Sequence, residues 1–191
     1  MSRTLRYLLT ILLALTAVAL PVAAATAPTP VPVAAMSCAT GWGSTGEWVM
    51  PLGAAPLTAV RTGRHDCFDR VVFDLAGPAA GHRVEYVDQV FQDGSGAVLP
   101  VPGGARLLVN INHPAYDESG NPTILPAPTA GRQITDVRGY RTLRSVVYGS
   151  SFEGATTFGV GVRARLPFRV LTLDGPGSGS RVIVDVAHRW S

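Results

Sequence analysis

The chain has 191 residues and a mass of 20.0 kDa, room for one domain of ordinary size, and its 47% hydrophobic and 15% charged residues exclude an intrinsically disordered protein. Its 21 Gly and 15 Pro follow no Gly-X-Y period, so collagen is excluded and many turns between short elements are expected. Of its 16 basic residues, Arg3 and Arg6 fall in a predicted leader. The remaining 14 nearly equal the 13 Asp and Glu in number, and this near-zero net charge does not support nucleic-acid binding.

The first 25 residues have the order of a secretory signal peptide. Arg3 and Arg6 precede an apolar run over residues 7–20, and small residues follow up to Ala25. The run is shorter than the roughly 20 residues that a membrane-spanning helix needs. We therefore predict a signal peptide over residues 1–25, cleaved after Ala25 or alternatively Ala27, with no transmembrane anchor left after cleavage. The protein is expected to be secreted or cell-wall associated.

A linker and a possible disulfide follow the leader. Residues 26–37 are rich in Pro and Ala and predict an extended linker before one β domain over residues 38–191. The chain has two Cys residues, Cys38 and Cys67. An even pair is more often bridged than free in an oxidising compartment, so we predict a disulfide between them.

Past the linker, apolar and polar residues alternate with a period of two, the pattern of half-buried β-strands. In the clearest run, Phe158, Val160 and Val162 fall on one face, and Arg163 and Arg165 fall on the other. One buried face and one face in water are typical of antiparallel sheets. The predicted strands, about nine, are 57–61, 70–75, 83–91, 97–101, 106–111, 145–148, 156–166, 168–173 and 181–188.

Turn-forming sequences separate these strands. Residues 93–96 and 174–177 have the composition of hairpin turns. Residues 114–131 are rich in Pro and Gly and too long for a hairpin loop, so we expect a surface excursion there. Residues 132–144 approach helical spacing and are compatible with one helical turn. The whole pattern predicts an all-β fold, a β-sandwich or a barrel.

The two ends of this strand-rich region resemble a known family. Residues 58–75 and 83–87 resemble the opening of the AMIN-like domain of secreted actinobacterial proteins, and residues 157–161, 167–170 and 181–188 resemble its close. The resemblance covers roughly residues 55–190. It implies an antiparallel β-sandwich related to the AMIN domain, a targeting module, not the catalytic part, of the cell-wall amidases and secretin-type proteins that carry it.

No stretch has the sequence of a catalytic site. The chain has four His but no Gly-x-Ser-x-Gly elbow, and its Gly-rich stretches lack the Lys of a phosphate-binding loop. The acidic turns at 93–96 and 117–121 lack the full spacing of a Ca²⁺ loop, and the two Cys lack zinc-site spacing. We therefore expect no enzyme activity, no cofactor and no metal site.

Arginine side chains mark the best candidate for a binding surface. Arg163 and Arg165 lie on the polar face of one predicted strand, and Arg169 joins them if the next strand pairs with it as a hairpin. In one interpretation Asp185 or Asp74 neutralises these charges, since like charges on one sheet face repel. In the other, Arg163, Arg165, Arg169 and Asp185 form a face that binds a peptide carboxylate or a wall phosphate through bidentate hydrogen bonds.

Two further features bear on such a face. Gly159 and Gly161 would leave it low enough for a ligand to approach. Trp42 and Trp48 could stack on sugars, although packing is the more common role of such residues.

The predicted function is that of a non-catalytic binding module at the cell envelope, with peptidoglycan or another wall polymer as its partner. One alternative is a protein-interaction module of the cell surface that docks an envelope protein by a strand edge or by residues 114–131. The other is a small secreted hydrolase whose site has no recognisable motif. The oligomeric state is left open.

Overall fold

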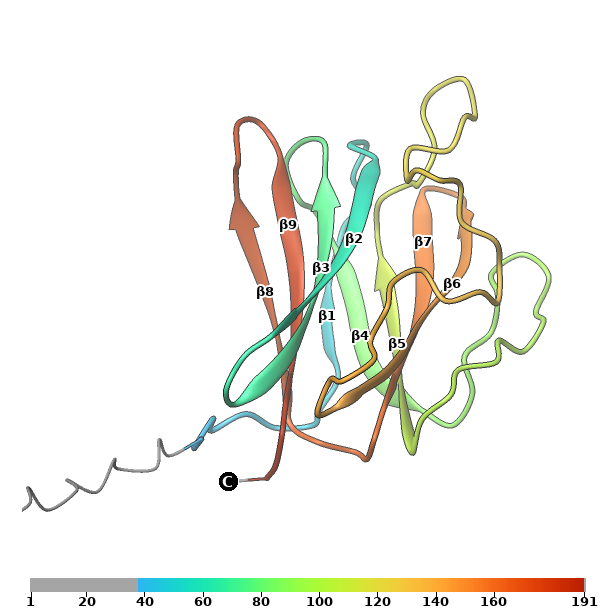
Figure 1. The fold of residues 1–191 in the computed structure, drawn as a ribbon. Coiled ribbons are helices and arrows are strands. Elements are labelled where there is room, and N and C mark those ends of the chain that lie inside the picture. Colours follow the sequence, from blue (N-terminus) through green and yellow to red (C-terminus); the bar gives the residue numbers. More distant parts are fainter. Residues whose placement is uncertain (1–37, 191) are drawn as a thin grey trace, which may run out of the picture. The chain divides into compact units, whose positions relative to one another are not determined.

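The computed structural model describes residues 38–190, in which two antiparallel sheets pack face to face (Figure 1). The five-stranded sheet has the order β1-β4-β5-β7-β6, and the four-stranded sheet has the order β2-β3-β9-β8. The strands are β1 Glu47–Val49, β2 Leu57–Arg64, β3 Phe68–Leu75, β4 His82–Val87, β5 Ala105–Ile111, β6 Leu143–Phe152, β7 Ala155–Val162, β8 Phe168–Asp174 and β9 Ser180–Ala187. The predicted leader and linker lie outside the described residues and stay predictions.

The core lies between the two sheets and follows from the alternation in the sequence. Phe73 on β3 and Phe158 on β7 are fully buried, with ring centroids 4.9 Å apart across the sandwich. Val184 on β9 and Val109 on β5 are buried in the same cluster. The predicted all-β sandwich with nine strands is confirmed, and the described residues contain no helix.

One of the nine predicted strands is wrong, and one strand was missed. Residues 97–101 form no strand beyond an isolated bridge at Val98; Leu99 and Val101 instead pack with Val90 and Val147 in a second apolar cluster. The missed strand is β1, whose Glu47–Val49 is too short to show alternation. Apolar and polar residues do alternate at 97–101. The apolar side chains of this segment pack against one face of the sheet, but its backbone does not pair with a strand of the sheet.

The surface excursion expected at residues 114–131 is present and contains neither helix nor strand. The helical turn that residues 132–144 would permit does not form, because this segment runs along the edge of β6. The amide of Ile134 donates to the carbonyl of Val146 at 2.9 Å, and the amide of Tyr148 donates to the carbonyl of Arg132 at 3.0 Å.

Strand β7 is buried on both faces, contrary to the expected polar face in water. The segment between β4 and β5 covers the second face: a Cβ on Gly159 would lie 2.3 Å from Val101 Cγ2, and one on Gly161 would lie 1.9 Å from the carbonyl oxygen of Pro102. The two glycines therefore make room for the protein's own chain, not for a ligand. The second apolar cluster is the physical reason for this difference.

Candidate functional site

The disulfide predicted between Cys38 and Cys67 is confirmed, with their Cα atoms 5.1 Å apart. It ties the segment before β1 to the turn between β2 and β3. A second tie is the amide of Phe168 at the start of β8, which donates to the carbonyl of Gly43 at 2.8 Å. The segment 38–46 is thus fixed beside the edge of the four-stranded sheet.

Asp185 is the centre of a buried ion cluster on the outer face of that sheet. Its side chain is fully buried and accepts hydrogen bonds from Arg70 at 2.7 and 2.9 Å and from Arg169 Nε at 3.0 Å. The hydrogen bonds to Asp185 raise the pKa of Arg70. The guanidinium of Arg169 lies 4.3 Å from the ring centroid of Trp42, and that of Arg70 lies 5.3 Å from the ring centroid of Phe68. Both guanidinium groups therefore have partners within the fold, although the one carboxylate offsets only one of the two positive charges.

Arg163 and Arg165 lie elsewhere, in the connection between the two sheets. Strand β7 ends at Val162, and β8 belongs to the other sheet, so the two strands form no hairpin. An Nη2 hydrogen of Arg163 is donated to the backbone carbonyl of His188. Arg165 donates to the side chain and the carbonyl of Ser44, both at 3.3 Å. The structure thus separates the predicted face into the pair Arg163 and Arg165 and the pair Arg169 and Asp185.

Tyr86 fixes the connection that carries Arg165. Its hydroxyl donates to the carbonyl of Leu166 at 2.8 Å and accepts the amide of the same residue at 2.9 Å. The guanidinium of Arg165 lies 5.0 Å from the Tyr86 ring centroid. Burial raises the pKa of Tyr86, so its hydroxyl keeps its proton at neutral pH and can make both hydrogen bonds.

A hollow of about 350 Å³ lies around His188, at the end of β9. Nε2 of His188 lies 3.0 Å from Asp69 Oδ1, and Nδ1 lies 3.1 Å from the carbonyl oxygen of Asp66. Asp69 Oδ2 accepts the amides of Thr142 and Leu143 at 2.5 and 3.0 Å. Both ring nitrogens of His188 are therefore occupied. No Ser, Thr or Cys side chain in the described part of the chain is hydrogen-bonded to them.

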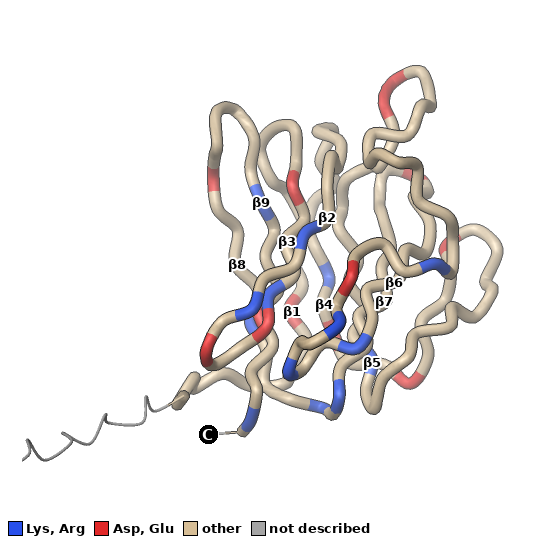
Figure 2. Tube along the Cα trace, viewed as in Figure 1, with Lys and Arg blue, Asp and Glu red and all other residues tan. Residues whose placement is uncertain are grey.

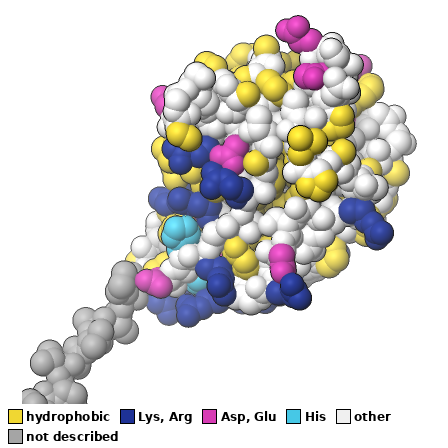
Figure 3. All heavy atoms as spheres, turned by 45° about the horizontal axis from the view of Figure 1, so that its top comes forward, with side chains coloured by type: hydrophobic (Ala, Val, Ile, Leu, Met, Phe, Trp, Pro, Cys, Tyr) yellow, Lys and Arg dark blue, Asp and Glu magenta, His cyan; other side chains and the backbone are white. Residues whose placement is uncertain are grey.

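Arginines line this hollow or lie on segments next to it: Arg64 and Arg141 line it, and Arg163 donates to the carbonyl of His188. Six of them form no ion pair with a carboxylate among residues 38–190, and we call them the arginine end: Arg64, Arg141, Arg144, Arg163, Arg165 and Arg189. Figure 2 shows the basic residues concentrated at the lower end of the sandwich, and Figure 3 shows them beside the histidine side chains. The nearby acidic residues include Asp66 and Asp69, the second of which is paired with His188, and Asp88, which lines a separate hollow together with Arg165.

Backbone carbonyls hold several of these arginines. Arg141 donates to the carbonyl of Asp66 at 3.3 Å, and Arg144 donates to the carbonyls of Tyr140 and Leu143 at 3.3 and 2.9 Å. A neutral carbonyl fixes a guanidinium without cancelling its charge. The arginine end is therefore a positive and partly preorganised surface.

This assembly could hardly be predicted from the sequence, because its residues come from separate segments. Arg64 lies at the end of β2, Arg141 and Arg144 precede or begin β6, and His188 and Arg189 follow β9. The regular spacing of Arg138, Arg141 and Arg144 was the one local signal available, and it belongs to a segment whose fold could not be predicted.

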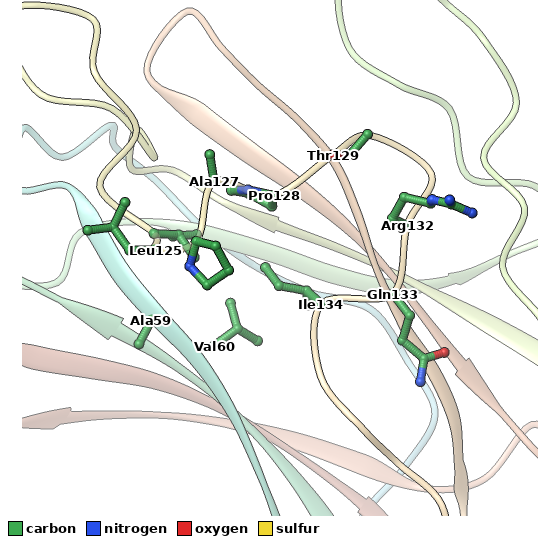
Figure 4. A pocket seen from close by; sticks show the side chains of 11 residues that line it. Ala59, Val60, Leu125, Ala127, Pro128, Thr129, Arg132, Gln133 and Ile134 are labelled. Atoms are coloured by element: carbon green, nitrogen blue, oxygen red, sulfur yellow. The ribbon is translucent and has the colours of Figure 1, made fainter.

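A second hollow, of about 310 Å³, is a groove between β2 and residues 124–134 (Figure 4). Val60, Leu125 and Ile134 give it apolar walls, and Arg132 and Gln133 lie at one side. The groove lies on the excursion that the sequence marked as a possible docking segment. It carries no carboxylate.

Other kinds of site are limited within the described range. Residues 38–190 hold no group of three or more His, Cys, Asp or Glu side chains arranged to bind a metal ion. The same residues form no helix with the length and apolarity needed to cross a membrane.

Comparison with known proteins agrees with the fold. Residues 55–188, well over half of the chain, match the AMIN-like domain. No curated protein matches the chain. This match points to a module associated with the cell envelope, and the disulfide is consistent with a location outside the cytoplasm. The chain belongs to the AMIN-like domain family.

Proposed function

We propose that this protein is a non-catalytic binding module of the cell envelope that holds an anionic group of a wall polymer at the arginine end. The family match supports the association with the envelope. The single observation that carries the ligand class is the set of six arginines whose charges no carboxylate pairs.

The chemistry of guanidinium supports phosphate or carboxylate as the bound group. Its planar fork donates two parallel hydrogen bonds to either anion, and such charge-assisted bonds are among the strongest in proteins. Arg163 and Arg165 are held by His188 and Ser44 and stay exposed. A polymer that repeats its charge can contact several of the six arginines at once, which adds affinity without any single deep pocket.

In this proposal Arg169 and Asp185 support the site without facing the ligand. Their ion cluster fixes Trp42 of the segment 38–46, and that segment carries Ser44, the partner of Arg165. Arg163 and Arg165 are the residues that contact the anion.

A protein-docking function is the second candidate, and the apolar groove beside residues 124–134 favours it. Leu125 is among the most exposed apolar side chains of the described chain. An envelope protein with an extended apolar segment would fit such a groove. The two candidates use different surfaces, so variants can separate them.

The test is cosedimentation of the purified protein with isolated cell wall. The double variant Arg163→Gln and Arg165→Gln is expected to bind roughly tenfold more weakly. The control is Arg61→Gln with Arg181→Gln, which removes the same charge from the outer face of the four-stranded sheet and is expected to bind as the wild type does. Equal binding by both double variants would overturn the proposal. Loss of binding in Leu125→Ser alone would support the docking function instead.

A further inference from the structure

The largest of the surface hollows described, about 570 Å³, lies on the outer face of the five-stranded sheet, between β1 and the segment that follows β4. Its volume falls within the range of small-ligand sites. It is lined by residues of β1, β4 and β5 and by Asp93. None of the six residues of the arginine end lines it.

One wall of this hollow is an exposed aromatic ring. Trp48 on β1 is 66% exposed, and Met50, just after β1, is 81% exposed. The guanidinium of Arg83 lies 5.8 Å from the Trp48 ring centroid, on the neighbouring strand β4. The indole is thus positioned by a neighbour but covered by nothing in the described chain. A flat apolar surface of this kind stacks well on another ring.

The opposite wall presents oxygen atoms that lack donors. Asn110 Nδ2 donates to Thr157 Oγ1 at 2.9 Å and lies 3.4 Å from Asp93 Oδ2, which also accepts from Thr157. With the amide turned this way, Asn110 Oδ1 and Asp93 Oδ1 have no partner among residues 38–190. Asn112 likewise uses only its Nδ2, 3.4 Å from two backbone carbonyls. Three acceptor oxygens therefore remain for a ligand that supplies hydrogen-bond donors.

A buried histidine borders the hollow from the other side of the sheet. His82 lines the hollow and is only 6% exposed, and its Nδ1 has no hydrogen-bond partner in the described chain. A buried polar atom without a partner costs free energy, and such atoms are uncommon in folded proteins. His82 is opposite the core residue Ile111 in the register of β4 and β5, so its ring lies on the core side of the sheet and gives no argument for a ligand in this hollow.

The charges of the hollow argue for a neutral ligand. Arg83 donates to Glu85 Oε1 at 2.7 Å, so its charge is paired, and Asp93 adds a negative charge. A phosphate or a carboxylate would be repelled there. Hydroxyl groups on a saturated ring match both walls, because they donate to the three oxygens while the C–H face of the ring lies against the indole. We infer that this hollow binds a neutral pyranose of an oligosaccharide, stacked on Trp48 and hydrogen-bonded to Asp93, Asn110 and Asn112.

Isothermal titration calorimetry with neutral hexasaccharides, namely maltohexaose, cellohexaose and chitohexaose, tests this site. At least one is expected to bind the wild type, and Trp48→Ala is expected to weaken it roughly tenfold or more. Trp190→Ala, which removes an indole 56% exposed near Arg165, is the matched control and is expected to bind as the wild type does. Asn112→Ala is a second variant at the site, because this side chain makes only long contacts.

The inference is overturned if none of the three binds more tightly than about 10 mM, or if Trp48→Ala and Asn112→Ala both leave the affinity unchanged. The site does not depend on the arginine end. Saccharide binding should persist in Arg163→Gln with Arg165→Gln and at 0.5 M salt, whereas binding of an anionic polymer should weaken under both changes.

Discussion

Asp185 is the residue on which the outer face of the four-stranded sheet depends, because its buried carboxylate forms ion pairs with two arginines from neighbouring strands. Asp185→Asn keeps the shape of the side chain but removes its charge and offers an NH₂ to donors. We expect the free energy of unfolding to fall by about 2 kcal/mol, as for a lost hydrogen bond to a charged group. Urea denaturation measures it.

The matched control is Asp74→Asn. Asp74 also accepts a bidentate pair, from Arg61 at 2.6 and 2.7 Å, but the arginine side chain is 58% exposed. Water screens such a pair, so the loss should stay below about 1 kcal/mol. Equal losses in the two variants would contradict the role assigned to burial.

His113 makes the stability depend on pH. Its Nδ1 donates to the carbonyl of Ala55 at 2.7 Å and its Nε2 accepts the amide of Ala80 at 2.8 Å, so the folded protein holds the neutral ring. Burial lowers the pKa of His113 below its ordinary value. The unfolded chain therefore takes up a proton first as the pH falls below about 6.5, and the free energy of unfolding decreases, by at most about 1.4 kcal/mol per pH unit for this group.

Urea denaturation at pH 7.5 and 5.5 tests this, with His113→Gln as the comparison. The wild type should lose more stability than the variant between the two pH values, since glutamine does not titrate. The same loss in both proteins would show that His113 is not the group responsible. Burial also lowers the pKa of His82, so some loss should persist in the variant.

At the scale of elements, the alternation of side chains predicted eight of the nine strands, because each of those strands buries one face in the core. It failed at residues 97–101, where the same alternation packs a loop onto a sheet. It could not find β1, whose three residues pair with Val84, Arg83 and His82 of β4. Pairing between segments distant in the sequence leaves no local pattern.

The segment between β4 and β5, which packs on the second face of β7, leads to a prediction about stability. Gly161→Ala would place a methyl group against the backbone carbonyl oxygen of Pro102 and the hydroxyl of Ser145. We expect a loss of roughly 1–3 kcal/mol in the free energy of unfolding, as for other overpacked sites. Gly43→Ala is the control, because its methyl group would meet only the amide of Thr45, at 3.9 Å. A fully stable Gly161→Ala would show that the segment does not cover the strand as described.

At the scale of the whole molecule, charge is nearly balanced in number but not in space. The 14 Arg and 13 acidic residues outside the predicted leader give almost no net charge, yet the basic residues concentrate at the lower end of the sandwich, where Arg64 and Arg141 line the hollow at His188. The composition therefore predicted that the protein carries no large net positive charge. The position of the arginine end could be found only from the three-dimensional structure. Arg163 and Arg165 were identified from the sequence because they follow the clearest strand; their neighbours Arg64 and Arg141 come from distant segments.

Mapping by NMR shows whether an anionic polymer binds at this end of the sandwich. Poly(glycerol phosphate) and polyglutamate are titrated into the ¹⁵N-labelled protein at low salt. We predict that amide shifts concentrate in residues 64–66, 139–144, 163–165 and 188–190, and that they shrink at 0.5 M salt. Shifts confined to the groove at residues 124–134, or no shifts with either polymer, would show that the arginine end is not the binding surface.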